Sequence, residues 1–267
     1  MKIRAIILSA LILCGISAVI MYSRAAQPQQ KSSVITQAIN DKNTPMVIKN
    51  LILKMKEQMK VNDDQFPELI KEVENYTNSC ADSASVAVLH SMLAEMYQNY
   101  YQRNQWTINQ RTQLSGYIPE DIRVWTSNLF TDKIKEEIDL SLRPTALLQN
   151  TPVSKFKDIL EIGKDSQTLR PTLYEFLAFR ALDIQPTVQI YKDLIAFQNK
   201  EPNMKSVLLT ELDYLRFLYG DKRDKESFEA YMNALDELYR NLASQNYAAE
   251  ILIAKLDLVS GSMFRYV

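Results

Sequence analysis

Residues 225–243 read KESFEAYMNALDELYRNLA, and the spacing of their apolar side chains decides the fold class. The apolar positions recur at every third or fourth residue, and they are Phe228, Tyr231, Met232, Leu235, Leu238, Tyr239 and Leu242. This is the period of an amphipathic α-helix with one buried face and one solvated face. The segment therefore predicts a helix that packs against a core on one side.

The segments around this stretch have the same period. We expect helices over residues 187–199, 204–219, 225–243 and 247–260, separated by loops of three to five residues. Loops this short force neighbouring helices to pack antiparallel. The C-terminal third is therefore predicted to be a stack of helical hairpins that resembles a tetratricopeptide-type solenoid, although no strict repeat of about 34 residues is present.

Helix-start signals continue toward the N-terminus. Thr44-Pro45 supplies an N-cap and a proline at the first helical position, so a helix is expected from there to about Lys60. One further helix is predicted after Pro67, and another from the N-cap Asp82 to Arg103. A third is predicted after the N-cap Thr126, a fourth from Pro152 to Ile162, and a fifth after Pro171. The helix after Asp82 is apolar around most of its circumference, which predicts a central position.

The whole chain is predicted to be all-α. Only five glycines occur, and they are isolated, so the left-handed turns that β-hairpins need are few. We divide the chain into a signal peptide or membrane anchor (1–25), a linker (26–33), a helical domain (34–185), the hairpin region (186–260) and a tail (261–267).

The N-terminus has the parts of an export signal. Lys2 and Arg4 precede a continuous run of apolar or small residues over 5–22, and small residues at Ser23 and Ala25 allow cleavage after Ala25. The run is also at the lower limit of length for a membrane-spanning helix, so a retained anchor is the alternative. We therefore expect an exported protein of the periplasm or cell envelope, anchored by residues 5–22 if the leader is retained.

Charge and cysteine content exclude two classes of protein. The formal net charge is −1, from 31 basic and 32 acidic residues. A nucleic-acid binder normally has a stripe of basic residues, and this sequence has none. Cys14 lies in the leader and Cys80 is alone in the rest of the chain, so no intramolecular disulfide framework is expected.

The residue types that carry out catalysis are isolated in this sequence. His90 is the only histidine, and we interpret it as a packed histidine on the long helix rather than a base or ligand. Asp63-Asp64 and Glu136-Glu137 lie in lysine-rich surroundings and are expected on solvated helix faces. Cys80 has no base nearby in the sequence and is expected to be inert. We predict no catalytic residue, no cofactor and no metal site; an enzyme would require a polar pocket around His90.

One aromatic group has two interpretations. Tyr97, Tyr100, Tyr101 and Trp106 occur close together near the end of the long helix. They could form a platform that binds a peptide or glycan partner, but packing between helices is the commoner role of such a group. The irregular stretch that follows, QRTQLSGYIPED at 110–121, is the best candidate for a functional loop or an internal boundary.

Several segments resemble the N-terminal helical region of large bacterial alpha-2-macroglobulin-like proteins. They are AVLHSMLAEMYQNYYQRNQWTINQRTQL (87–114), PEDIRVW (119–125), RPTLYEFL (170–177), IYKDLIAFQNK (190–200) and LLTELDYLRFLYG (208–220). Their order extends the resemblance over about residues 34–258. The resemblance implies an exported protein in which β-sandwich domains follow the helices, with a bait segment that traps proteases and, in many members, a Cys-x-x-Gln thioester.

The sequence departs from that plan. Neither Cys14 nor Cys80 is followed by glutamine three residues later, and no strand-rich or bait-like segment is apparent. We therefore expect a truncated or split member whose helices act as a non-catalytic scaffold. Its partners would be proteins: proteases through domains outside this chain, or other proteins of the cell envelope. The alternative is a stand-alone helical-repeat module of the envelope that binds a peptide or protein.

Overall fold

The computed structural model describes residues 43–61, 65–112, 117–160, 163, 165–200, 203–220, 224–242 and 247–263. These residues contain eleven α-helices and two short 3₁₀ helices but no strand, which confirms the predicted all-α class. None of these helices is both long enough and apolar enough to cross a lipid bilayer. The predicted leader (1–25) and linker (26–33) lie outside the described residues.

The chain divides into two compact units, Met1–Leu177 and Ala178–Val267. The division falls within helix α9 (Leu173–Ile184), whereas the boundary predicted from the sequence follows residue 185.

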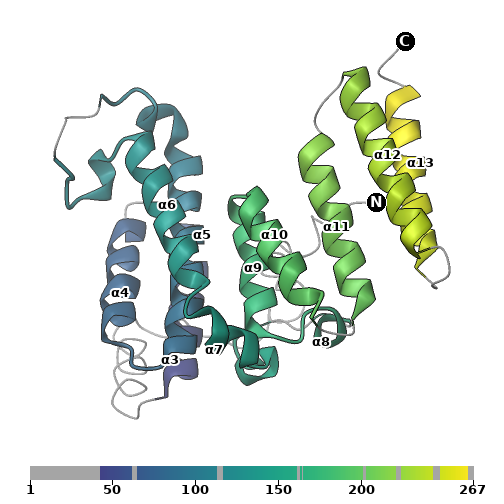
Figure 1. The fold of residues 1–267 in the computed structure, drawn as a ribbon. Helices are drawn as coiled ribbons and strands as arrows, with labels where there is room; N and C mark the ends of the chain where they lie inside the picture. Colours follow the sequence, from purple (N-terminus) through teal and green to yellow (C-terminus); the bar gives the residue numbers. More distant parts are fainter. Residues whose placement is uncertain are drawn as a thin grey trace, which may run out of the picture. The chain divides into compact units, whose positions relative to one another are not determined.

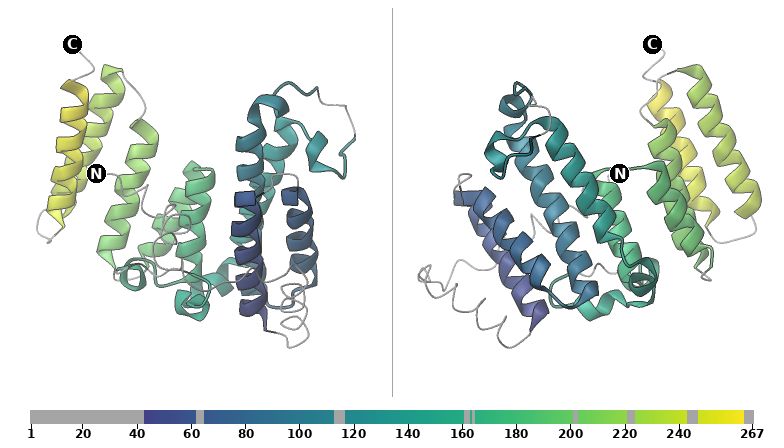
Figure 2. Two further views of the ribbon diagram at one scale, coloured as in Figure 1. Left: turned by 180° about the vertical axis from the view of Figure 1, so that it is seen from behind. Right: turned by 60° about the vertical axis from the view of Figure 1, so that its left-hand side comes forward.

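The first unit is built around α5 (Ser83–Ile108), which packs against α4 (Phe66–Ser79) and α6 (Ser127–Ser141). Helix α3 (Thr44–Val61) lies against α4 and α5 (Figures 1 and 2). Buried side chains occur around much of α5, including Leu89, Leu93 and Met96, so its predicted central position is confirmed.

Side-chain capping hydrogen bonds form at the starts of α3 and α5, whereas α4 and α6 have none. The carboxylate of Asp82 accepts a hydrogen bond from the Ser85 backbone N–H at 3.3 Å, as the N-cap prediction requires. Asn43 takes the role predicted for Thr44, since its side-chain oxygen accepts from the Met46 N–H at 3.2 Å. Thr126 occupies the N-cap position of α6, but its hydroxyl is buried and forms no capping hydrogen bond.

The predicted helix from Pro152 to Ile162 is wrong. Over residues 152–160, the described part of this span, the structure has only the 3₁₀ helix η3 (Val153–Phe156), which is followed by turns. The chain around Pro152 is extended and pairs with the segment before α9: the Val153 N–H donates to the Pro171 carbonyl at 2.9 Å, and the Leu173 N–H donates to the Thr151 carbonyl at 2.8 Å. These non-local bonds replace the first turn of the predicted helix. The neighbouring helices α7 (Thr145–Asn150) and α8 (Ser166–Leu169) are short.

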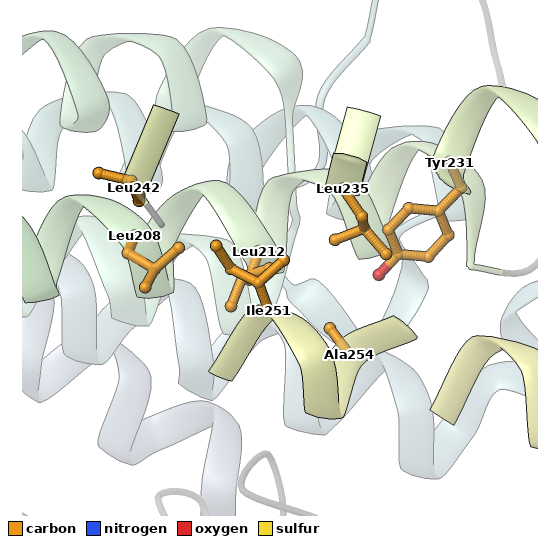
Figure 3. Close-up of a cluster of buried hydrophobic side chains, with 7 residues drawn as sticks. All are labelled: Leu208, Leu212, Tyr231, Leu235, Leu242, Ile251 and Ala254. Atoms are coloured by element: carbon orange, nitrogen blue, oxygen red, sulfur yellow. The ribbon is translucent and has the colours of Figure 1, made fainter. Parts of the chain in front are cut away.

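The second unit contains α10 (Val188–Gln198), α11 (Met204–Tyr219), α12 (Lys225–Leu242) and α13 (Ala248–Met263). Each helix packs against the next one along the chain, as the short loops predict. Leucine and tyrosine side chains from α11 and α12 meet Ile251 and Ala254 of α13 in one buried cluster (Figure 3). The antiparallel hairpin arrangement of this region is therefore confirmed.

Candidate partner-binding surface

The structure separates the four aromatic residues that the sequence analysis groups together. Tyr97 and Tyr100 are buried in the core of the first unit, and Tyr101 is half-buried. Of these four residues, only Trp106 is largely exposed, with 78% of its area accessible to solvent. The first two residues thus have the packing role that the sequence analysis favours, while partner binding by Tyr101 and Trp106 stays a prediction.

The buried tyrosines belong to an aromatic cluster that joins α5 to α6 and to the segment between them. Trp125 stacks on Tyr97 with ring centroids 5.6 Å apart and an interplanar angle of 7°. Phe130 of α6 lies within 5.3 Å of the Trp125 ring and 5.7 Å of the Tyr100 ring. Such ring contacts stabilise a core beyond the area that they bury.

The hydroxyl of Tyr97 holds this cluster against α4. It donates a hydrogen bond of 2.6 Å to the Glu74 carboxylate. Burial, and after it the hydrogen bond to this carboxylate, raises the pKa of Tyr97. The hydroxyl therefore stays protonated and remains a donor.

The α5–α6 connection, residues 109–126, is fixed to this cluster by specific bonds. The indole N–H of Trp125 donates to the Pro119 carbonyl at 2.6 Å, and the Arg111 guanidinium donates to the Trp125 carbonyl at 2.7 Å. Ile122, in the 3₁₀ helix η2 (Ile122–Val124), is buried. A long connection with so few regular elements is therefore attached to the core at several points.

An ion-pair group attaches the same connection to α4. The guanidinium of Arg123 contacts the Glu68 carboxylate at 2.8 Å and the Asp121 carboxylate at 3.3 Å. The Asp121 carboxylate also accepts from the Arg123 backbone N–H at 2.9 Å, and this bond is the main cause that lowers the pKa of Asp121. The three side chains are 41–59% exposed, so these pairs orient the segment more than they stabilise the fold.

The connection also exposes apolar side chains to solvent. Tyr117, Ile118 and Val124 are each more than half accessible. The sequence predicts a functional loop in the surrounding stretch but does not single out these three residues. A signal was present: Tyr117 and Ile118 are adjacent apolar residues in a segment that is polar or glycine apart from Leu114 and Pro119.

A buried polar group lies between α5 and α6, and it corrects one prediction. Glu137 is expected on a solvated face, but only 2% of it is exposed. Its carboxylate lies 2.7 Å from Nδ1 of His90 and 2.9 Å from Nζ of Lys133. Burial alone would lower the pKa of Lys133, but its hydrogen bonds to Glu137 and Glu136 outweigh burial and raise the pKa. The group thus joins a charged lysine and the histidine through one carboxylate.

His90 therefore lies at the interface of two helices, α5 and α6, where it contacts the Glu137 carboxylate. A depression of 350 Å³ on α6 is lined by Asp132, Lys135, Glu136, Asp139, Leu140 and Arg143, and it includes neither His90 nor Glu137.

Cys80 follows the end of α4, and its thiol contacts the Asp82 carbonyl at 3.9 Å. Within the described part of the chain, no three histidine, cysteine, aspartate or glutamate side chains are grouped to hold a metal ion. Asp63 and Asp64 lie outside that part.

Comparison with known proteins adds no assignment. No family model, curated protein or solved structure matches the chain. The resemblance to alpha-2-macroglobulin-like proteins thus depends only on the motifs quoted above and stays a prediction.

Proposed function

We propose that this chain is a non-catalytic helical scaffold of an exported, alpha-2-macroglobulin-like protein, and that it binds another protein through the α5–α6 connection. The export signal and the order of the motifs support the first part. The observation that carries the second part is the set of exposed apolar side chains, Tyr117, Ile118 and Val124, on a connection attached to the core.

The attachment of the connection favours binding for a thermodynamic reason. A flexible loop loses conformational entropy when it binds, and this loss subtracts from affinity. Here Trp125 is already stacked on Tyr97, and Arg123 already pairs with Glu68. The exposed side chains are thus presented on a segment that is partly ordered before any partner arrives. Aromatic side chains are also enriched at protein–protein interfaces.

The proposal assigns no protease trapping to this chain by itself. Covalent trapping in the resembled family uses a glutamine three residues after the reactive cysteine, and serine stands at that position after both Cys14 and Cys80. Incubating the purified chain with a panel of proteases should leave their activities unchanged. Covalent capture or strong inhibition of a protease would refute the scaffold proposal.

Site-specific photo-crosslinking tests the binding surface. A photoreactive amino acid at Ile118 should give a discrete crosslinked product in cells that produce the protein. The same amino acid at Lys135, which is exposed on α6 of the same unit, is the matched control and should give none. Equal products from both positions, or none from Ile118, would contradict the proposal.

The successive packing of α10 to α13 favours a second candidate function. A stand-alone repeat module would bind a peptide or protein on the hairpins of the second unit instead of the α5–α6 connection. A crosslinker at Lys192, an exposed residue of α10, distinguishes the two functions. A product from Lys192 and none from Ile118 would favour the repeat module.

A further inference from the structure

Helix α13 has one apolar face that packs within the second unit. Ile251 and Ala254 are buried, and they lie in the cluster formed with Leu208 and Leu212 of α11 and with Leu235 of α12 (Figure 3). Leu258 is partly buried against the same cluster. This face accounts for the attachment of α13 to the helices before it.

A second apolar face of α13 points away from that cluster. Leu252, Ile253 and Leu256 are 49%, 58% and 66% exposed, and Val259 continues the row at 40%. At 3.6 residues per turn, these positions span about 120° of the helix circumference. That width is typical of the stripe by which a helix packs against a neighbour.

The form of this face indicates a helix as its occupant. A helix that is apolar around most of its circumference is normally covered on both sides. In this unit α11 and α12 each pack between two neighbouring helices, but α13 packs against α12 with one face and exposes the other. One more helix on the Leu252–Leu256 face would continue the same packing.

The charged residues beside this face indicate which charges should border the apolar stripe of the incoming helix. Glu250 and Asp257 lie along one edge, since they are seven residues apart and about two turns separate them. The nearby Lys255 is already paired with Asp236 of α12. A basic flank on the incoming helix would therefore complement the acidic edge.

The same charges disfavour an antiparallel pair with a second copy of this chain. When two identical helices pack antiparallel, each flank meets its own symmetry mate. The edge with Glu250 and Asp257 would then face itself, and like charges placed together cost free energy.

We propose that the Leu252–Leu256 face of α13 binds an amphipathic helix of a partner protein, whose apolar stripe is bordered by lysine or arginine. This is a separate surface from the α5–α6 connection, so it goes beyond the first proposed function, and it specifies a surface and a partner class in the unit that the second candidate function would use. Because the two surfaces lie in different units, a variant of one leaves the other intact.

Synthetic helices of defined sequence test this proposal. The probe is a fluorescent peptide of about 18 residues, or five turns, with leucines at i, i+3, i+4 and i+7 and lysines beside them. A second peptide has glutamates in place of the lysines. With the full chain, anisotropy titration should show saturable binding of the lysine peptide and binding of the glutamate peptide that is at least about tenfold weaker.

Matched variants locate the binding site. Leu256→Glu should weaken binding of the lysine peptide at least about tenfold, because it places a charge in the apolar contact. Leu53→Glu is the control, since Leu53 is 50% exposed on α3 of the other unit, and it should bind like the unchanged chain. Asp257→Lys should reduce the preference for the lysine peptide. Circular dichroism confirms that each variant is folded.

Three results would overturn the proposal. The first is equal binding of the lysine peptide by the Leu256→Glu and Leu53→Glu variants. The second is equal affinity for the two peptides. The third is a dimer of the chain in sedimentation velocity that Leu256→Glu dissociates, because a second copy would then occupy the face.

Discussion

Replacing Glu137 with alanine should destabilise the first unit far more than replacing an exposed residue of α6 would. The Glu137 carboxylate is buried and contacts both Nδ1 of His90 and Nζ of Lys133. A hydrogen bond joins this carboxylate to Nδ1 of His90. The substitution removes the partner of both groups at once.

The expected magnitude follows from what each partner retains. Removing one member of a buried ion pair typically costs about 3–5 kcal/mol, because the other charge stays buried without compensation. Lys133 keeps a second partner, since its Nζ also lies 2.9 Å from the Glu136 carboxylate. We therefore expect a loss at the lower end, about 3 kcal/mol. In a domain of 150–250 residues this lowers the melting temperature by about 6–12 °C.

Glu136→Ala is the matched control for this prediction. Glu136 is the preceding residue of the same helix, but its side chain is 58% exposed. Its removal should change the free energy of unfolding by about 0.5 kcal/mol or less. Both variants are measured by urea and thermal unfolding, followed by far-ultraviolet circular dichroism.

A double-mutant cycle with His90→Ala tests whether the contact itself carries the effect. The two single losses should exceed the loss of the double variant by about 0.5–3 kcal/mol, the usual range for residues in contact. A cycle without coupling, or a Glu137→Ala variant as stable as Glu136→Ala, would refute the reasoning.

Three further predictions concern other parts of the chain. Trp125→Phe keeps an aromatic ring but removes the donor to the Pro119 carbonyl, so it should cost about 1 kcal/mol and speed limited proteolysis within the connection. Thr172→Ala removes the hydroxyl that accepts from the Glu175 N–H at the start of α9, and it should cost about 1 kcal/mol in urea unfolding. Burial raises the pKa of Glu211, so its contribution to stability is full below the unfolded pKa of about 4.3 and is lost as the pH rises through the folded pKa. Glu211→Gln should therefore match the unchanged chain in melting temperature at pH 4 and exceed it at pH 7.

The sequence predicted the helices of the second unit well because their signal is local. The apolar period of residues 225–243 and the short loops beside it depend only on neighbouring residues, and α12 spans Lys225–Leu242. Asp82 was also a correct N-cap, since it bonds to Ser85 three residues later.

The wrong predictions involve partners that are distant in the sequence. The predicted helix after Pro152 is replaced by pairing with the segment before α9. Glu137 was placed in solvent because its partner His90 is 47 residues earlier in the chain. No local pattern contains such contacts, so periodicity and charge alone could not reveal them.

The candidate surfaces show the same contrast between what the local sequence predicts and what distant contacts decide. The sequence located the α5–α6 connection by its irregular composition, but the structure showed that Tyr100 is buried while Tyr117 and Ile118 are exposed. The sequence also placed apolar residues all around α13, without indicating which of them meet the core.

The sequence by itself determined that the chain forms helices, where most of them begin, and which of them are amphipathic; it ended α5 at Arg103, whereas that helix continues to Ile108. These properties follow from the chain's local geometry, because hydrogen bonds within a helix join residues four positions apart. Only the tertiary structure decided which apolar faces are covered and which carboxylates are buried. Burial depends on neighbours that folding brings together from distant positions, so it belongs to the packed molecule rather than to any one segment.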